Sequence, residues 1–132
     1  ETSKIYGDKM VNAWRRSYDI PPPKLTKLEV ADEKNKANFT IDTEYNWPAS
    51  ESLKNTFDRV ISFWKDEIEN KFSNKNVLIV AHGNTIRSIV KYIENISDID
   101  IVKVEISTGQ PLIYEFNNAK LPKKKYFEFH DI

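Results

Sequence analysis

Residues 77–93 read VLIVAHGNTIRSIVKYI and carry the clearest structural pattern in the chain. The first five, Val77–Ala81, form a continuous apolar run of strand length with several β-branched side chains, which is typical of a strand buried on both faces. A tight turn follows at His82-Gly83-Asn84, and apolar residues then return at helical spacing: Ile86, Ile89, Val90 and Ile93. A buried strand, a turn and a helix in this order predict an α/β fold with a parallel sheet.

The residues before this strand predict a long amphipathic helix. Ser50 is a good N-cap after Pro48, and Glu51 would lie in the first turn, where the helix dipole favours a carboxylate. Apolar residues then recur at steps of three and four and define one stripe: Leu53, Phe57, Val60, Ile61, Trp64, Ile68 and Phe72. The stripe indicates that this helix packs on a sheet or on other helices.

The remaining elements are less marked. Residues 8–18 predict a short amphipathic helix, with a break at Gly7 and a stop at the prolines of 21–23. Residues 24–47 show no sustained period, so we expect a long excursion loop with room for a short strand or a turn of helix. Ser97 is expected to cap a short helix through Val102, and residues 111–116 and 125–129 predict two further strands.

Length and composition narrow the class of protein. The 132 residues (15.5 kDa) fit one domain, 1–132, with a single core. Basic and acidic residues number 20 each, which argues against nucleic acid and acidic membranes as partners, and Lys123–Lys125 is expected to be a solvated surface run. The absence of cysteine excludes disulfides and thiolate chemistry, and two histidines are too few for a structural zinc site, so no metal is expected.

Targeting signals are not evident in the sequence. No apolar run approaches the length of a membrane span, and the first ten residues lack the basic-then-apolar order of a signal peptide. We therefore expect a cytoplasmic protein. Because the chain opens without methionine, the sequence leaves open that it is a piece of something longer.

His82 lies where the ligands of α/β proteins collect. Its imidazole should project from the carboxyl edge of the sheet beside the amino end of the next helix, where unpaired amides and the helix dipole favour phosphate. Gly83 permits close approach of a ligand to the backbone. A histidine there can stabilise a transferring phosphoryl group or move protons. The alternative is a partly buried histidine bonded to a backbone carbonyl, and position alone favours neither interpretation.

Arg15 and Arg16 are a second candidate site, because guanidinium forks match the oxygens of phosphate and carboxylate. Two in succession suit a doubly charged ligand. Neighbouring side chains on a helix diverge by about 100°, so at most one of them can face a site unless the helix has already ended. The alternative is a favourable cationic helix end, worth about 0.3–1 kcal/mol.

Four segments taken together resemble a known family. They are WRRSYDIPPP at 14–23, ESLK at 51–54, the stretch from Val77 to Arg87, and STGQPLIYE at 107–115. In this order they resemble the cofactor-dependent phosphoglycerate mutases of the histidine phosphatase superfamily, nearly from end to end of the chain. Short arginine pairs are common, but this ten-residue context is specific. The resemblance implies a three-layer α/β/α sandwich.

The resemblance also implies roles for single residues. It assigns His82 to the second active-site histidine, Arg15 and Arg16 to substrate phosphate or carboxylate, and Gly83 and Asn84 to ligand contacts. Only a structural or site-wall role is carried over to Glu51, and Arg87 is expected to be structural. The implied activity is an isomerase of glycolysis that interconverts 3-phosphoglycerate and 2-phosphoglycerate through a phosphohistidine primed by 2,3-bisphosphoglycerate. Phosphoglycerates are thus the implied small-molecule partners.

One part of the family's pattern is missing from this sequence. Family members begin with a strand bearing an Arg-His-Gly-Glu motif, whose histidine becomes phosphorylated, whereas His130 lies in EFHD at 128–131. The resemblance is therefore to a C-terminal half, a partial sandwich that lacks the first strands and leaves an apolar edge exposed at Val77–Ala81. We expect the chain to be inactive alone and to pair with another copy or with the missing N-terminal half. The alternative is a truncated remnant that acts as a non-catalytic anion-binding or assembly module.

Overall fold

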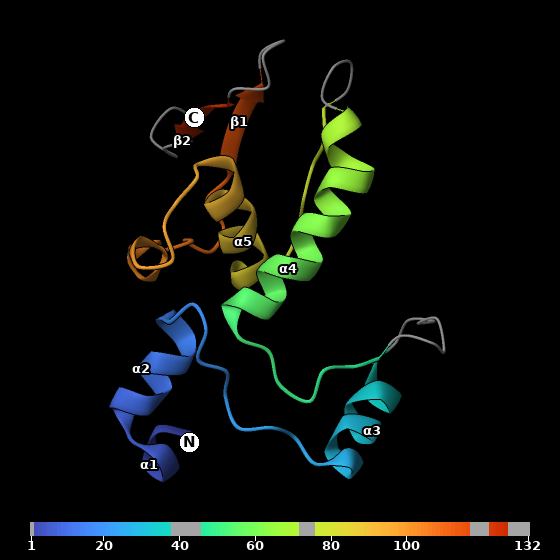
Figure 1. Cartoon of the computed structure of the whole chain (residues 1–132), viewed down its shortest axis with the longest axis vertical. Coiled ribbons are helices and arrows are strands. Elements are labelled where there is room, and N and C mark those ends of the chain that lie inside the picture. Colours follow the sequence, from blue (N-terminus) through green and yellow to red (C-terminus); the bar gives the residue numbers. More distant parts are fainter. Residues whose placement is uncertain (1, 38–45, 72–75, 117–121, 127–132) are drawn as a thin grey trace.

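A computed structural model describes residues 2–37, 46–71, 76–116 and 122–126, and two packed helices form its centre (Figure 1). Helix α4 (Leu53–Phe63) packs against helix α5 (Gly83–Ile93). Both helices were expected from their apolar spacing, and α5 begins directly after His82 as predicted. None of the helices in the described ranges is long and apolar enough to cross a bilayer.

The core lies between these two helices and one strand. Ile61, Trp64 and Ile89 are buried together, and other apolar side chains pack around them: Phe57, Val60, Ile68, Tyr92, Ile93 and Phe116. The stripe predicted from Phe57 to Ile68 is thereby confirmed; Leu53 is also buried, and Phe72 lies outside the described residues. The core thus joins α5, at whose amino end His82 lies, to α4 and β1.

Helix α4 begins two residues later than predicted. The Ser52 hydroxyl accepts from the Asn55 amide at 3.3 Å, and Asn55 Oδ1 accepts from the Ser52 amide at 3.0 Å. These reciprocal bonds form a capping box, which satisfies more amides than a single cap at Ser50. Ser50 instead donates its hydroxyl to the Pro22 carbonyl. The predictions that Ser50 is the N-cap and that Glu51 lies in the first turn are wrong.

The far end of α4 continues as irregular helix. A π-helical turn, η1 (Trp64–Ile68), is followed by a 3-10 turn, η2 (Glu69–Lys71). The helical path therefore runs on to the last described residue before position 72, close to the length that the stripe predicts.

The predicted strand at residues 77–81 is the main correction. The segment has no regular secondary structure and pairs with no other described segment, and Leu78 and Val80 are each 88% exposed. A strand forms only where neighbours accept and donate its backbone hydrogen bonds, and the described residues place none beside it. Burial on both faces is therefore wrong for this structure, and the expected exposed apolar side chains are present but do not form the edge of a strand.

The described sheet consists of two antiparallel strands rather than parallel ones. Strand β1 (Leu112–Phe116) pairs with β2 (Pro122–Tyr126) in a register that runs from Leu112 opposite Tyr126 to Phe116 opposite Pro122. The first strand was predicted within one residue. The second begins three residues earlier than predicted, and positions 127–129 lie outside the described residues.

The N-terminal helices differ from the prediction at their ends. Helix α1 (Thr2–Tyr6) and helix α2 (Asp8–Arg16) meet at Gly7, whose positive φ of 79° favours glycine and produces the expected break. Helix α2 ends at Arg16 rather than at residue 18, because Ser17 adopts an extended backbone as the C-cap. The Lys54 amide donates to the Tyr18 carbonyl at 2.7 Å and so holds the end of α2 beside the start of α4.

Residues 24–47 contain more helix than expected. Helix α3 (Lys27–Lys36) spans ten residues and begins at a capping box, in which Thr26 and Glu29 bond each other's backbone amide. Local capping overrides the missing apolar period, since no side chain of α3 is buried. Positions 38–45 lie outside the described residues.

A short 3-10 helix, η3 (Asp100–Lys103), follows α5. The predicted short helix is present, but its N-cap is Ile99 rather than Ser97 and it ends at Lys103; the Ser97 hydroxyl accepts from the Asp100 amide at 3.0 Å from outside the helix. Ile101 of η3 is fully buried, η3 contacts α2, and Arg87 of α5 donates to the Ile101 carbonyl at 2.8 Å.

Candidate anion-binding site

The amino end of helix α5 is capped by the ring of His82. Its Nδ1 accepts from the Asn84 amide at 3.2 Å, and the first bond within the helix runs from the Ile86 amide to the His82 carbonyl at 3.1 Å. The amides of Gly83 and Thr85 therefore have no acceptor within the helix, and the partial positive charge of the dipole is concentrated here.

This cap determines which nitrogen of the His82 ring can donate a hydrogen bond. Because Nδ1 accepts a hydrogen bond, the neutral imidazole carries its proton on Nε2, which makes Nε2 the donor. His82 is exposed, and its ring bonds an amide rather than a carbonyl. This arrangement differs from the alternative of a partly buried histidine bonded to a carbonyl.

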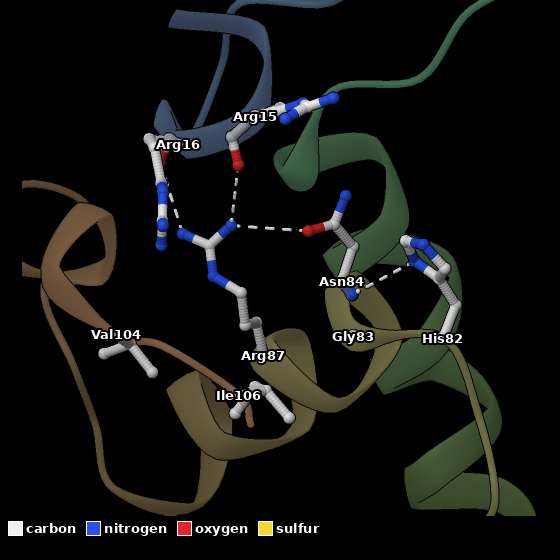
Figure 2. A pocket seen from close by; sticks show the side chains of 8 residues that line it. All are labelled: Arg15, Arg16, His82, Gly83, Asn84, Arg87, Val104 and Ile106. Atoms are coloured by element: carbon white, nitrogen blue, oxygen red, sulfur yellow. Dashed lines mark hydrogen bonds between the residues drawn. The ribbon is translucent and has the colours of Figure 1, made fainter. Parts of the chain in front are cut away.

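Arg15 and Arg16 are the last two residues of helix α2, and both line the same cavity as His82. Both still belong to the helix, which ends only after Arg16, and Figure 2 shows their guanidinium groups pointing in different directions, as the divergence of neighbouring helical side chains predicts. Arg16 forms an ion pair with Glu105, with 2.7 Å between Nη2 and Oε1, and both side chains are largely exposed. An anion that binds Arg16 must share it with this carboxylate or displace it.

Arg87 closes the inner side of the cavity. Its side chain is only 5% exposed and donates to the carbonyls of Arg15 at 3.1 Å, Arg16 at 3.2 Å and Ile101 at 2.8 Å. Burial lowers the pKa of its guanidinium, and the nearby positive charge of Arg16 lowers it further. From the sequence, Arg87 was expected to be structural only. The sequence signal for its burial was its position three residues before Val90, on the same face of the helix.

These side chains surround an open cavity of about 420 Å³ (Figure 2). It is lined by residues from α2, α5 and the segment after η3: Arg15, Arg16, His82, Gly83, Asn84, Arg87, Val104 and Ile106. The five site residues predicted from the sequence thus lie together, and the structure adds Arg87 and two aliphatic walls. Arg15 and Arg16 thus bring two cationic side chains to this cavity beside a helix amino end, where negative charge is favoured.

Glu51 does not line this cavity. Its carboxylate forms a two-pronged ion pair with Arg59 of α4, with distances of 2.7 Å to Nε and 2.9 Å to Nη2. The pair joins the residue before the N-cap to the second turn of the helix, which agrees with a structural role. His130, the other imidazole of the sequence, lies outside the described residues.

Comparison with known proteins shows the family to which this chain belongs. The family model of the histidine phosphatase superfamily (branch 1) matches residues 23–127, well over half of the chain. The chain therefore belongs to the histidine phosphatase superfamily. The superfamily fold is α/β, as the sequence predicted, and the helix-rich structure described here is consistent with a part of such a fold.

The most similar relatives narrow this class further. The chain is 47% identical over 131 residues to a protein of Buchnera aphidicola subsp. Cinara cedri, and 43% identical over 128 residues to one of Enterococcus faecalis. A third relative, from Zymomonas mobilis, is 43% identical over 131 residues. All three are named 2,3-bisphosphoglycerate-dependent phosphoglycerate mutase. The matches cover 94–96% of this chain but 54–56% of the relatives, so the chain spans about half their length.

Proposed function

We propose that this chain forms the C-terminal half of a 2,3-bisphosphoglycerate-dependent phosphoglycerate mutase, which interconverts 3-phosphoglycerate and 2-phosphoglycerate in glycolysis. One observation carries the proposal: Arg15, Arg16 and His82, which are far apart in the sequence, meet with the amino end of α5 around one cavity. The names of the relatives supply the substrate class.

The donor set fits a phosphoglycerate. Such a molecule carries a carboxylate and a phosphate ester, and guanidinium groups bind both kinds of oxygen in pairs. Arg15 and Arg16 would each offer a guanidinium group to an anionic part of the substrate, and the Gly83 amide with His82 Nε2–H would donate to another part. 2,3-Bisphosphoglycerate presents the same groups and, when bound, supplies the phosphoryl group. His82 would hold or release a proton at Nε2 beside the transferred group.

In this proposal the nucleophilic histidine belongs to the rest of the protein. The sequence contains no Arg-His-Gly-Glu motif, so the residues of this chain bind and orient the substrate and handle a proton. The same observation favours a second candidate, a truncated remnant that binds anions or assembles without turnover. A cytoplasmic location and the choice between a second copy and an N-terminal half as partner stay predictions from the sequence.

Calorimetric titration with inorganic phosphate tests the anion site. We expect the 132-residue chain to bind phosphate with millimolar affinity, because it holds only part of the contacts. Arg16→Ala and His82→Ala should each weaken binding by about tenfold, since each removes one charge-assisted or polar bond worth about 1.5 kcal/mol.

A matched control separates the site from general charge. Lys27 is an exposed cation on α3, away from the cavity, so Lys27→Ala should leave the phosphate affinity unchanged. Equal affinity in the parent and in both site variants would show that these residues are structural and that no anion site exists here.

A further inference from the structure

We propose that Arg87 is the positioning residue of the anion site, which fixes the end of helix α2, and with it Arg15 and Arg16, beside the amino end of α5. The inference rests on the proposed function, because it concerns how the same cavity is held in shape. It assigns Arg87 a role through its neighbours rather than through contact with the ligand.

The donors of Arg87 are already used by the protein. Its two Nη atoms carry four N–H groups, and four oxygens face them: three backbone carbonyls and Asn84 Oδ1 at 3.3 Å. Nε is buried and has no acceptor in the described part of the chain. A guanidinium in this state has no unused Nη–H with which to bind an anion in the cavity; Figure 2 draws its bonds to Arg15, Arg16 and Asn84.

The carbonyls that accept from Arg87 belong to the backbone that carries the arginine pair and to the buried turn η3. Two of them belong to Arg15 and Arg16, at a helix end where carbonyls lack partners within the helix. The third belongs to Ile101, which is fully buried in η3. Arg87 therefore ties the backbone that carries the arginine pair to α5 and to the core at once. A buried cation also compensates the partial negative charge of this helix end.

Lys91 provides a matched control one turn further along α5. It is also a buried cation at 8% exposure, it donates to the Ile96 carbonyl at 2.6 Å, and it pairs with Asp98 at 2.7 Å. It does not line the cavity. Its Nζ also lies 4.8 Å from the centre of the Tyr18 ring, so its removal should lower stability, but it leaves the bonds from Arg87 to the Arg15 and Arg16 carbonyls in place.

The experiment is an NMR titration of the 15N-labelled 132-residue chain with inorganic phosphate. The Gly83 amide reports on the amino end of α5, and the Nε–H of Arg16 reports on the arginine pair. In the parent chain we expect both signals to follow one binding curve. In Arg87→Met the phosphate affinity reported by the Gly83 amide should fall by at least about fivefold. The Arg16 signal should then no longer follow the same binding curve as the Gly83 amide.

Arg87→Lys keeps the charge but should not rescue binding, because one ammonium group cannot span the carbonyls that the planar fork reaches. Lys91→Met should lower the melting temperature while both probes keep the parent curve. A structural role alone predicts the opposite pattern, in which phosphate affinity per folded molecule is the same in every variant. The proposal is overturned if either Arg87 variant binds phosphate as tightly as the parent chain and its Gly83 and Arg16 signals still follow one binding curve.

A measurement on the parent covers the case in which the variants do not fold. The Nη protons of Arg87 should exchange slowly with water and stay unshifted by phosphate while those of Arg16 shift. Rapidly exchanging Arg87 Nη protons, or shifts as large as those of Arg16, overturn the positioning role. A parent chain in which neither Gly83 nor Arg16 responds to phosphate contradicts the proposed function instead, so the two failures are distinguishable.

Discussion

No phosphoryl group should be transferred to the 132-residue chain when it is incubated with labelled 2,3-bisphosphoglycerate. Phosphohistidine formation needs a nucleophilic imidazole in line with the leaving group. The cavity holds one imidazole, His82, among its described residues, and the Nδ1 of that ring is engaged by the Asn84 amide. Loss of a nucleophile lowers turnover by about 10⁶-fold in other enzymes, so acid-labile phosphate and mutase activity should both fall to background.

The Enterococcus faecalis relative is the positive control, because it is named as a mutase and is about twice as long. Under the same conditions it should take up label that is lost in acid. Stoichiometric labelling of the 132-residue chain that disappears in His82→Ala would make His82 a nucleophile and contradict the role proposed for it.

Self-association should be the second large effect. Leu78 and Val80 are each 88% exposed and lie in a segment whose backbone pairs with no described strand. A second copy can bury these side chains and accept the free backbone hydrogen bonds. Full burial contributes about 1.5–3 kcal/mol for each such side chain, or about 6–12 kcal/mol for the four in a symmetric dimer. Micromolar association corresponds to about 8 kcal/mol, so pairing of the two segments has to offset the entropic cost of association. Sedimentation of the chain should therefore show dimers or larger species.

The double variant Leu78→Lys/Val80→Lys should shift the distribution to monomer by more than about tenfold in dissociation constant. Leu28 on α3 is 82% exposed and serves as the control, since Leu28→Lys changes an equally exposed aliphatic side chain elsewhere. A parent chain that sediments as a well-folded monomer at micromolar concentration contradicts the association.

Periodicity predicted the two central helices well because their apolar side chains pack on each other within this chain. The stripe that includes Ile61 and Trp64 meets Ile89, so the pattern and its partner are both present. The strand at 77–81 failed for the opposite reason. Its apolar run predicts burial against neighbouring strands, and the described part of the chain contains no such neighbours. An apolar run shows that a segment favours burial, but not that partners for it are present.

The part of the candidate site that depends on neighbouring residues in the sequence could be predicted. His82 lies at the amino end of a helix because the turn and the spacing after it require this, and the resemblance placed the arginine pair with it. The link through Arg87 depends on contacts between residues more than 70 positions apart, and periodicity within a single segment carries no information about them. Ser52 displaced Ser50 as the cap through a bond to Asn55, a choice between two serines that composition cannot make.

Helix α3 should unfold separately from the core formed by α4 and α5. Its ten residues bury no side chain, and a helix this short is marginal in water without packing, so it opens independently of the core. Its amides should exchange hydrogen far faster than that of Val90, which is 1% exposed between the central helices. Hydrogen bonds from Thr26 hold the pKa of Glu29 below its ordinary value, so this stabilisation is lost as the pH falls through the lowered pKa. Acid should then melt α3 while α4 and α5 remain folded.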